Sequence, residues 1–209
     1  LGIENEFLTS GRLDNLMASY CAIDSLTNIT SVPDSTTIVT LFDNEEVGSN
    51  TASGGASPFL PNNLERIALS MDLTREQYLV SLANSFLLSV DGAHAVHPNY
   101  PDEYEKDHKV NLNGGPVIKL NANQKYVTDP RNTAFFEKLC EAADIPSQIY
   151  VNRADKSCGS TIGPITSTRT GIRTMDIGPP MVSMHSVREM GGVKDPHYLT
   201  RALKEYIGA

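Results

Sequence analysis

The sequence predicts an α/β fold, in which a doubly wound and mostly parallel sheet is flanked by helices. Short apolar runs, each of the length of a buried strand, alternate with segments of helical periodicity. The predicted strands are residues 36–42, 85–90, 117–120, 147–151 and 173–180. The predicted helices cover about 15–28, 62–71, 74–84, 130–140 and 196–206, and a further helix ends near Gly171.

Composition narrows the class of protein. A chain of 209 residues, 40% hydrophobic and 20% charged, can bury the core of one globular domain. The net charge of −8 argues against a protein that binds nucleic acid or a membrane surface. No apolar stretch approaches the roughly 20 residues that span a bilayer.

The cysteines give a prediction about the compartment. Cys21, Cys140 and Cys158 are three in number, and their spacing is not that of metal ligands. We therefore expect no disulfide scaffold and predict that the protein resides in a reducing compartment. The cytoplasm is the predicted location, in preference to a vacuole or lysosome.

Two adjacent carboxylates, Glu45 and Glu46, follow the predicted strand 36–42. Side chains that neighbour one another at a strand end point in different directions, so these two can have different roles. One can ligate a metal ion while the other takes a proton from water. A solvated acidic loop is the alternative that the pair alone would favour.

Two further groups of polar side chains flank predicted elements. Asp14 lies at the start of the first predicted helix, where it can be an N-cap or a rigidly held ligand. Asp91 ends the strand 85–90 and is followed by His94 and His97. At least one of these histidines is expected near the chemistry.

The second half of the chain adds three candidates. Lys119 interrupts an apolar strand, either at a sheet edge with its ammonium group in water or as a cation that meets a substrate carboxylate. The small, polar loop 155–164 is typical of a binding loop. His185 lies beyond the last predicted strand. Because ligands bind beyond the carboxyl ends of strands in such sheets, we expect the candidates to line a crevice there.

Carboxylates together with one or two imidazoles suit zinc, manganese or cobalt better than copper or an iron–sulfur cluster. Two metal ions about 3.5–4 Å apart can share a bridging carboxylate and a water that ionises near neutral pH. A free glutamate beside that water can carry the proton to a leaving amine. The constellation therefore predicts metal-dependent hydrolysis of a peptide bond.

Six motifs in a fixed order add a specific resemblance. They are RLDN (12–15), DNEEVGS (43–49), DGAHAVHPNY (91–100), GPVIK (115–119), GSTIGP (159–164) and MHSVRE (184–189). Together they resemble the M18 family of metallopeptidases, and most of all its aspartyl aminopeptidases. The resemblance implies a zinc-aminopeptidase-like fold, two Zn²⁺ ions that Mn²⁺ or Co²⁺ can replace, and a homo-oligomer, which is a dodecamer in the full-length family.

The resemblance also implies a role for each metal-site residue. Asp14 would bridge the two metal ions, and Glu45 would be the general base. Glu46 and His185 would hold one ion, and Asp91 would hold the other. The peptide bond between Asp14 and Asn15 is expected to be cis.

On the substrate side, the resemblance implies an aminopeptidase that releases an N-terminal Asp or Glu from peptides. Lys119 would read the acidic side chain, and His94 would lie near the substrate.

One departure concerns the first metal ligand of the family, a histidine that precedes an inserted dimerisation domain. Every histidine in this chain follows the Glu45–Glu46 motif, so none matches that ligand in order. We therefore expect residues 1–209 to be the C-terminal portion of a single catalytic domain, without the N-terminal segment and the inserted domain. Weak metal occupancy beside Asp91 is expected, with little or no turnover by this chain alone.

Two other functions compete with this prediction. One is an aminopeptidase of the same clan with broader specificity, which prefers apolar residues. The other is a catalytically inactive oligomeric scaffold that keeps the fold. The intact Glu45–Glu46 pair argues against a scaffold. A two-metal phosphatase is disfavoured, because neither an arginine cluster nor a phosphate-binding loop is evident.

Overall fold

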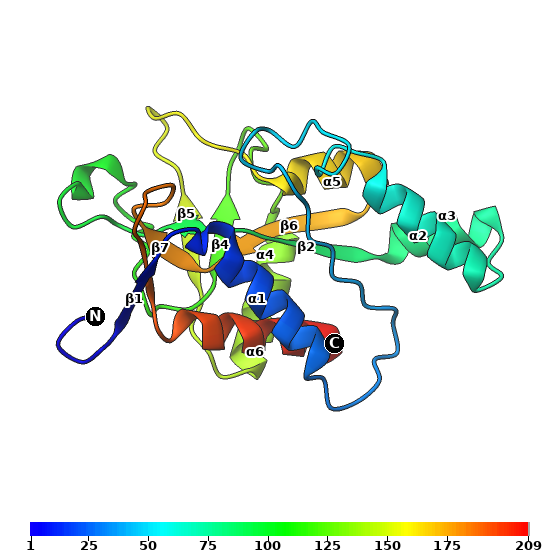
Figure 1. The fold of residues 1–209 in the computed structure, drawn as a ribbon, viewed down its shortest axis with the longest axis horizontal. Helices are drawn as coiled ribbons and strands as arrows, with labels where there is room; N and C mark the ends of the chain where they lie inside the picture. Colours follow the sequence, from blue (N-terminus) through cyan, green and yellow to red (C-terminus); the bar gives the residue numbers. More distant parts are fainter. Residues whose placement is uncertain (209) are drawn as a thin grey trace.

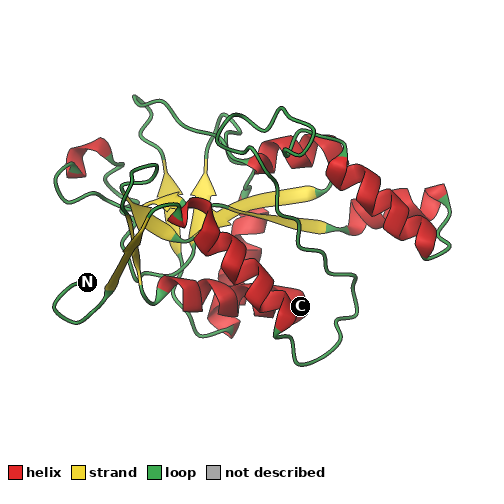
Figure 2. Cartoon of the chain, viewed as in Figure 1, coloured by secondary structure: helices red, strands yellow, loops and turns green. Residues whose placement is uncertain are grey.

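A computed structural model describes residues 1–208 and confirms the α/β class. Two four-stranded sheets lie next to each other, with helices on both sides (Figures 1 and 2). The structure differs from the prediction in having two sheets instead of one, and in the sheet that contains β2, β4, β5 and β6 two of the three strand pairings are parallel, as predicted. Within residues 1–208, no helix has both the length and the apolar character that a membrane crossing requires.

The central sheet contains the longer predicted strands. Its order is β2 (Phe86–Val90), β6 (Arg173–Gly178), β4 (Val117–Leu120) and β5 (Gln148–Val151). The β2–β6 and β4–β5 pairs are parallel, whereas β4 and β6 are antiparallel. The two inner strands, β4 and β6, are buried along most of their length, whereas β2 and β5 at the sheet edges are mostly half-buried.

The second sheet contains strands from both the N-terminal and the C-terminal parts of the chain. Its order is β1 (Phe7–Ser10), β8 (Glu189–Gly192), β7 (Pro180–Val182) and β3 (Ala93–His94). Only β3 and β7 are parallel. Strands β1, β3 and β8 were not predicted, because β3 has only two residues and the others, FLTS and EMGG, are not apolar runs.

The helices cover the sheets unequally. Helices α1 (Leu13–Thr27), α4 (Pro130–Ala142) and α6 (Asp195–Gly208) pack on one side of the central sheet, and α5 (Ile162–Thr170) lies on the other (Figure 1). Helices α2 (Phe59–Ser70) and α3 (Arg75–Asn84) form a hairpin that projects to the right in Figure 1. A 3₁₀ turn, η1, spans Pro101–Glu103.

Two helix starts follow from their capping residues. Thr74 caps α3, and Gln77 reaches back to complete a capping box. Asp129 caps α4 by accepting a hydrogen bond from the backbone N–H of Asn132 at 2.7 Å, with Pro130 in the first turn. Both helices begin within one residue of their predicted starts.

The predicted strand 36–42 is wrong for the described residues. These residues form no ladder with any strand in the part of the chain that the structure covers. Instead Phe42 packs edge-on against Phe59 of α2, with ring centroids 6.3 Å apart. An apolar sequence gives strand propensity, but a strand also needs a neighbour to satisfy its backbone hydrogen bonds.

The main core lies between the central sheet and helices α1, α4 and α6. Its buried members are Cys21, Ile118, Phe136, Leu139, Cys140, Ala143, Ile145, Met175, Ile177, Leu199, Ala202 and Leu203. Because this core holds β4 and β6 in place, it also fixes the side chains that extend from these strands toward the site.

Replacement of Phe136 tests that assignment. Its side chain is 0% exposed, so we expect Phe136→Ala to lower the free energy of unfolding by about 3–5 kcal/mol. The neighbouring Phe135 is 38% exposed and packs edge-on against Phe86, so Phe135→Ala is the matched control with a loss of about 0.5–1.5 kcal/mol. Urea unfolding followed by circular dichroism measures both. Equal losses would contradict the placement of the core.

Candidate metal centre

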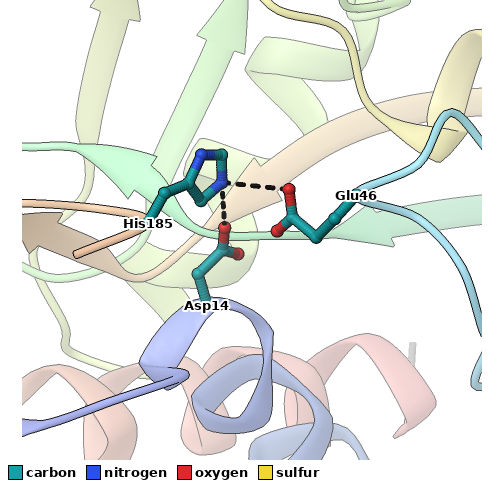
Figure 3. Close-up of side chains that lie close together, drawn as sticks. All are labelled: Asp14, Glu46 and His185. Carbon is teal, nitrogen blue, oxygen red and sulfur yellow. Dashed lines mark hydrogen bonds and ion pairs between the residues drawn. The ribbon is translucent and has the colours of Figure 1, made fainter. Parts of the chain in front are cut away.

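Three predicted metal ligands come together in the structure. Potential ligand atoms of Asp14, Glu46 and His185 all lie within 4.8 Å of one another (Figure 3). His185 Nε2 is 3.0 Å from Asp14 Oδ2 and 3.1 Å from Glu46 Oε2. Residues from the first helix, an early loop and a late loop therefore meet at one point.

Asp14 is held at the junction of β1 and α1. Arg12 adopts the left-handed conformation with φ 60°, and Asp14 and Asn15 are not helical. The peptide bond between Asp14 and Asn15 is cis, as the resemblance implied. Asn15 Nδ2 donates to Val90 O at 2.8 Å, which ties this junction to the end of β2. The N-cap alternative is wrong, because the Asp14 carboxylate contacts His185 instead of capping α1.

The Glu45–Glu46 pair lies in a tight turn. The N–H of Gly48 donates to Glu45 O at 2.8 Å, and the N–H of Ser49 donates to Asn44 O at 3.0 Å. Asn44 and Gly48 have φ values of 59° and 94°, a region that favours Asn and Gly. Glu46 contacts His185, whereas Glu45 lies outside the three-ligand cluster.

The cluster fits a cation. Oδ1 of Asp14 is buried and has no hydrogen-bond partner among the described residues. This atom faces Gly92, where an added Cβ would lie 3.0 Å from it. Burial raises the pKa of Asp14 to about 7, and the charges of Asp91 and Glu46 add to this. A divalent cation would give Asp14 Oδ1 a partner and would offset the repulsion among the carboxylates of Asp14, Asp91 and Glu46. Carboxylate and imidazole are both ligands that zinc accepts.

All the predicted site residues line one pocket. Its walls include Asp14, Glu45, Glu46, Asp91, His94, Lys119 and His185, together with Tyr126, Tyr150, Gly159, Ser160, Thr161 and Met184. The crevice that the sequence analysis expected is therefore present. His97 is not among the described residues of this wall, and its ring packs on Tyr100 instead.

Lys119 is not at a sheet edge, so the interpretation of an edge lysine with its ammonium group in water is wrong. Strand β4 lies between β5 and β6, and the lysine is only 2% exposed. Its Nζ is 3.2 Å from Asp91 Oδ2 and lies over the Tyr126 ring, 5.4 Å from the centroid. A buried ammonium group held by one carboxylate and one aromatic face keeps hydrogen-bonding capacity for a further anion.

Proton affinities in the pocket follow from burial and charge. Burial raises the pKa of Glu45 to about 7, and Asp91 and Glu46 contribute further. Desolvation of the His94 ring lowers its pKa, as does the Lys119 cation. For His185, desolvation lowers the pKa, but the carboxylates of Glu46 and Asp14 outweigh it and leave the pKa raised.

The loop 155–164 reaches the pocket through Gly159, Ser160 and Thr161. Asp176 on β6 anchors it, because Oδ1 accepts a hydrogen bond from Thr161 Oγ1 at 2.6 Å. A Cβ at Gly163 would lie only 2.3 Å from the same oxygen, so only glycine fits there. The prediction of a binding loop agrees with this position.

Three residues near the site were not predicted from the sequence. Tyr126 and Tyr150 line the pocket and pack edge-on at 6.3 Å, but scattered tyrosines carry no motif. Glu189 contacts the backbone of two candidate ligands, and it was noted only as part of a motif.

Comparison with known proteins identifies the family. The sequence profile of the family described as aminopeptidase I zinc metalloprotease (M18) matches residues 1–207. The chain belongs to the M18 family. It is therefore related to metallopeptidases that remove N-terminal residues, as the motifs predicted.

Sequence identity to individual M18 aminopeptidases supports the same family. The chain is 47% identical over 206 residues to a probable M18 family aminopeptidase 2 of Clostridium novyi, covering 99% of this chain and 47% of that protein. It is 45% identical over 217 residues to aspartyl aminopeptidase 4 of Saccharomyces cerevisiae, covering 98% of this chain and 44% of that one. The chain thus spans about half the length of the curated relatives that it matches.

Solved M18 structures share the fold. The structure of an Ape4 and Nbr1 complex matches all of this chain and 40% of the compared chain, with a TM-score of 0.93 and 44% identity. The Saccharomyces cerevisiae mApe1 dodecamer matches 99% of this chain and 47% of its own, with a TM-score of 0.84 and 32% identity. The arrangement of sheets and helices is therefore that of M18 aminopeptidases.

Removal of His185 tests the metal centre. We expect zinc to bind the wild-type chain, and His185→Ala to weaken binding by at least about 10-fold, because even residues behind a ligand contribute that much. The matched control is His108→Ala, which removes a histidine paired with Glu105 outside the pocket. Competition with a chromophoric chelator gives both affinities. Equal zinc affinity in the two variants would contradict the centre.

Proposed function

We propose that this chain carries the metal centre of an aminopeptidase that releases acidic N-terminal residues with two zinc ions. The observation that carries the proposal is one pocket in which the Asp14–Glu46–His185 cluster faces a buried lysine. The metal centre would act on the peptide bond. The ammonium group of Lys119 is a separate positive charge that can select the side chain of the substrate's N-terminal residue. Membership of the M18 family supports the first half of this proposal.

Different residues of the pocket would bind the metal and transfer the proton. Zinc, when bound, polarises the carbonyl of the scissile bond and lowers the pKa of water. Glu46 and His185 would hold one ion. Glu45 lines the same pocket but is outside the ligand cluster, so its carboxylate is free to take a proton from water and deliver it to the leaving amine.

A second zinc ion would lie between Asp14 and Asp91. Asp14 Oδ2 points to His185, whereas the unsatisfied Oδ1 faces the Asp91–Gly92 side. One carboxylate with its two oxygens on two sides suits a bridge. Asp91 is paired with Lys119 and lies outside the ligand cluster found among the described residues, which supports weaker metal occupancy there.

Lys119 is the proposed reader of the substrate. A carboxylate from an N-terminal Asp or Glu side chain can bind its ammonium group, with His94 on the pocket wall nearby. The name of the yeast relative, aspartyl aminopeptidase 4, supports the acidic preference. A broader aminopeptidase specificity is the alternative, and the burial of the cation argues against it.

The wider context is also proposed. We assign residues 1–209 to the C-terminal portion of one catalytic domain, since the chain matches about half of each M18 relative. The dodecamer of the related mApe1 supports a homo-oligomer. The free cysteines Cys21, Cys140 and Cys158 support a reducing compartment such as the cytoplasm.

Replacement of Glu45 separates an enzyme from a scaffold. We expect little or no turnover by the chain alone, so activity is measured in a chimera in which it replaces the matching half of the Clostridium novyi relative. Glu45→Gln in that chimera should lower kcat by about 10²–10⁴-fold on an N-terminal Asp peptide, because the proton carrier is lost. Zinc content, measured by mass spectrometry, should stay unchanged. Unaltered turnover would favour another base.

Replacement of Lys119 tests the acidic preference in the same chimera. Loss of one charge-assisted contact of about 1.5–3 kcal/mol should lower the ratio of kcat/KM for Asp over Leu peptides by about 10- to 100-fold in Lys119→Leu. The exposed Lys125 offers a control, Lys125→Leu, that should leave the ratio unchanged. An equal fall for Asp and Leu substrates in Lys119→Leu would refute the assignment.

A further inference from the structure

Glu189 holds two candidate metal ligands by their backbones. It opens β8 opposite Ser10 of β1, and it is 1% exposed. Its Oε2 accepts a hydrogen bond from the N–H of Asp14 at 3.0 Å, and its Oε1 accepts one from the N–H of His185 at 2.7 Å. One carboxylate therefore joins two residues that are 171 positions apart in the chain.

These two amides have no alternative partner in regular structure. Asp14 lies in the non-helical start of α1, and His185 has φ 67° in the loop between β7 and β8. Neither residue belongs to a strand ladder in the described chain. An unsatisfied buried N–H costs about 1–3 kcal/mol, so the Glu189 carboxylate stabilises two backbone conformations that would otherwise be unfavourable.

The buried charge of Glu189 has no cationic partner among the ion pairs of residues 1–208. Burial of an isolated carboxylate is costly, and its two N–H donors are the compensation that the structure offers. Glu189 also lies outside the three-residue ligand cluster. Its oxygens accept from the backbones of Asp14 and His185, whereas the side chains of these two residues contact each other in the cluster.

We propose that Glu189 is a positioning residue of the metal centre, which fixes the separation and orientation of Asp14 and His185. The inference rests on the metal centre proposed above. A metal site needs its ligands within a few tenths of an ångström of the correct geometry, and ligands from opposite ends of a chain are not aligned by local structure. A bridge through both main-chain amides supplies that alignment without occupying a ligand atom.

The structure contains a matched control for this role. Asp195 is also 1% exposed, and its carboxylate also accepts two backbone hydrogen bonds, from Asn113 N–H at 2.7 Å and Gly115 N–H at 3.0 Å. None of these residues lines the pocket in the described chain. Asp195 therefore shares the burial and hydrogen bonding of Glu189 without any link to a candidate ligand.

The test compares Glu189→Gln with Asp195→Asn in the 209-residue chain. An amide keeps the shape of the carboxylate but places an NH₂ group against one N–H donor, so one of the two hydrogen bonds is lost in each variant. We expect Glu189→Gln to weaken zinc binding about 10- to 100-fold, as substitutions behind a metal ligand do. Asp195→Asn should lower the melting temperature of the zinc-free chain but leave zinc affinity unchanged.

Two results would overturn the role. Glu189→Gln with wild-type zinc affinity would show that the bridge does not position the ligands, and an equal loss of affinity in Asp195→Asn would reduce it to general stability. Cobalt substitution adds a spectroscopic readout, because a changed absorption band in Glu189→Gln alone reports altered ligand geometry. If Glu189→Gln does not fold, amide hydrogen exchange of the wild type decides, since fast exchange at Asp14 and His185 would exclude the bridge.

Refutation of the metal centre and refutation of the role of Glu189 give different zinc-binding results. If the wild-type chain binds no zinc, or binds it equally well in His185→Ala, the centre is refuted and the positioning role falls with it. If His185→Ala loses zinc and Glu189→Gln does not, only the role of Glu189 is refuted.

Discussion

The site depends on the antiparallel pairing of β1 with β8. Phe7 pairs with Gly192 and Ser10 pairs with Glu189, so a strand near the N-terminus lies beside a strand from the C-terminal part of the chain. Asp14 follows β1 and His185 precedes β8, and their side chains meet only because these strands are in register. A shift of one residue would turn Glu189 to the other face of the sheet and separate it from both ligands.

Buried carboxylates connect this strand pair to the rest of the pocket. Asp176 accepts hydrogen bonds from Thr161 Oγ1 at 2.6 Å and from Val127 N–H at 2.8 Å, which brings two loops to the end of β6. Glu189 does the same for the loops that carry Asp14 and His185. Because loops have no ladder of their own, a carboxylate that accepts from two donors is an economical way to fix them. The pocket is consequently built from loops but held by strands.

The sequence predicted well what depends on local physics. Helices α3 and α4 begin directly after their capping residues, Thr74 and Asp129, because capping needs only residues a few positions apart. The charged residues that line the pocket were predictable from the order of the motifs, whereas Tyr126 and Tyr150 were not. Strand 36–42 was not, because apolar character is local whereas a hydrogen-bonded neighbour is not. The position of Lys119 inside the sheet likewise depends on strand order, which no single segment encodes.

Glu189 shows why part of the site is invisible in a sequence. Metal ligands are recognised by side-chain type, since only a few residues offer oxygen or nitrogen to zinc. A residue that acts on backbone amides has no such signature, because its partners Asp14 and His185 would offer the same N–H groups whatever their side chains were. The position of those amides becomes known only when the loops are placed in space. For this reason a glutamate that the sequence left without a role can be assigned one from two distances and its burial.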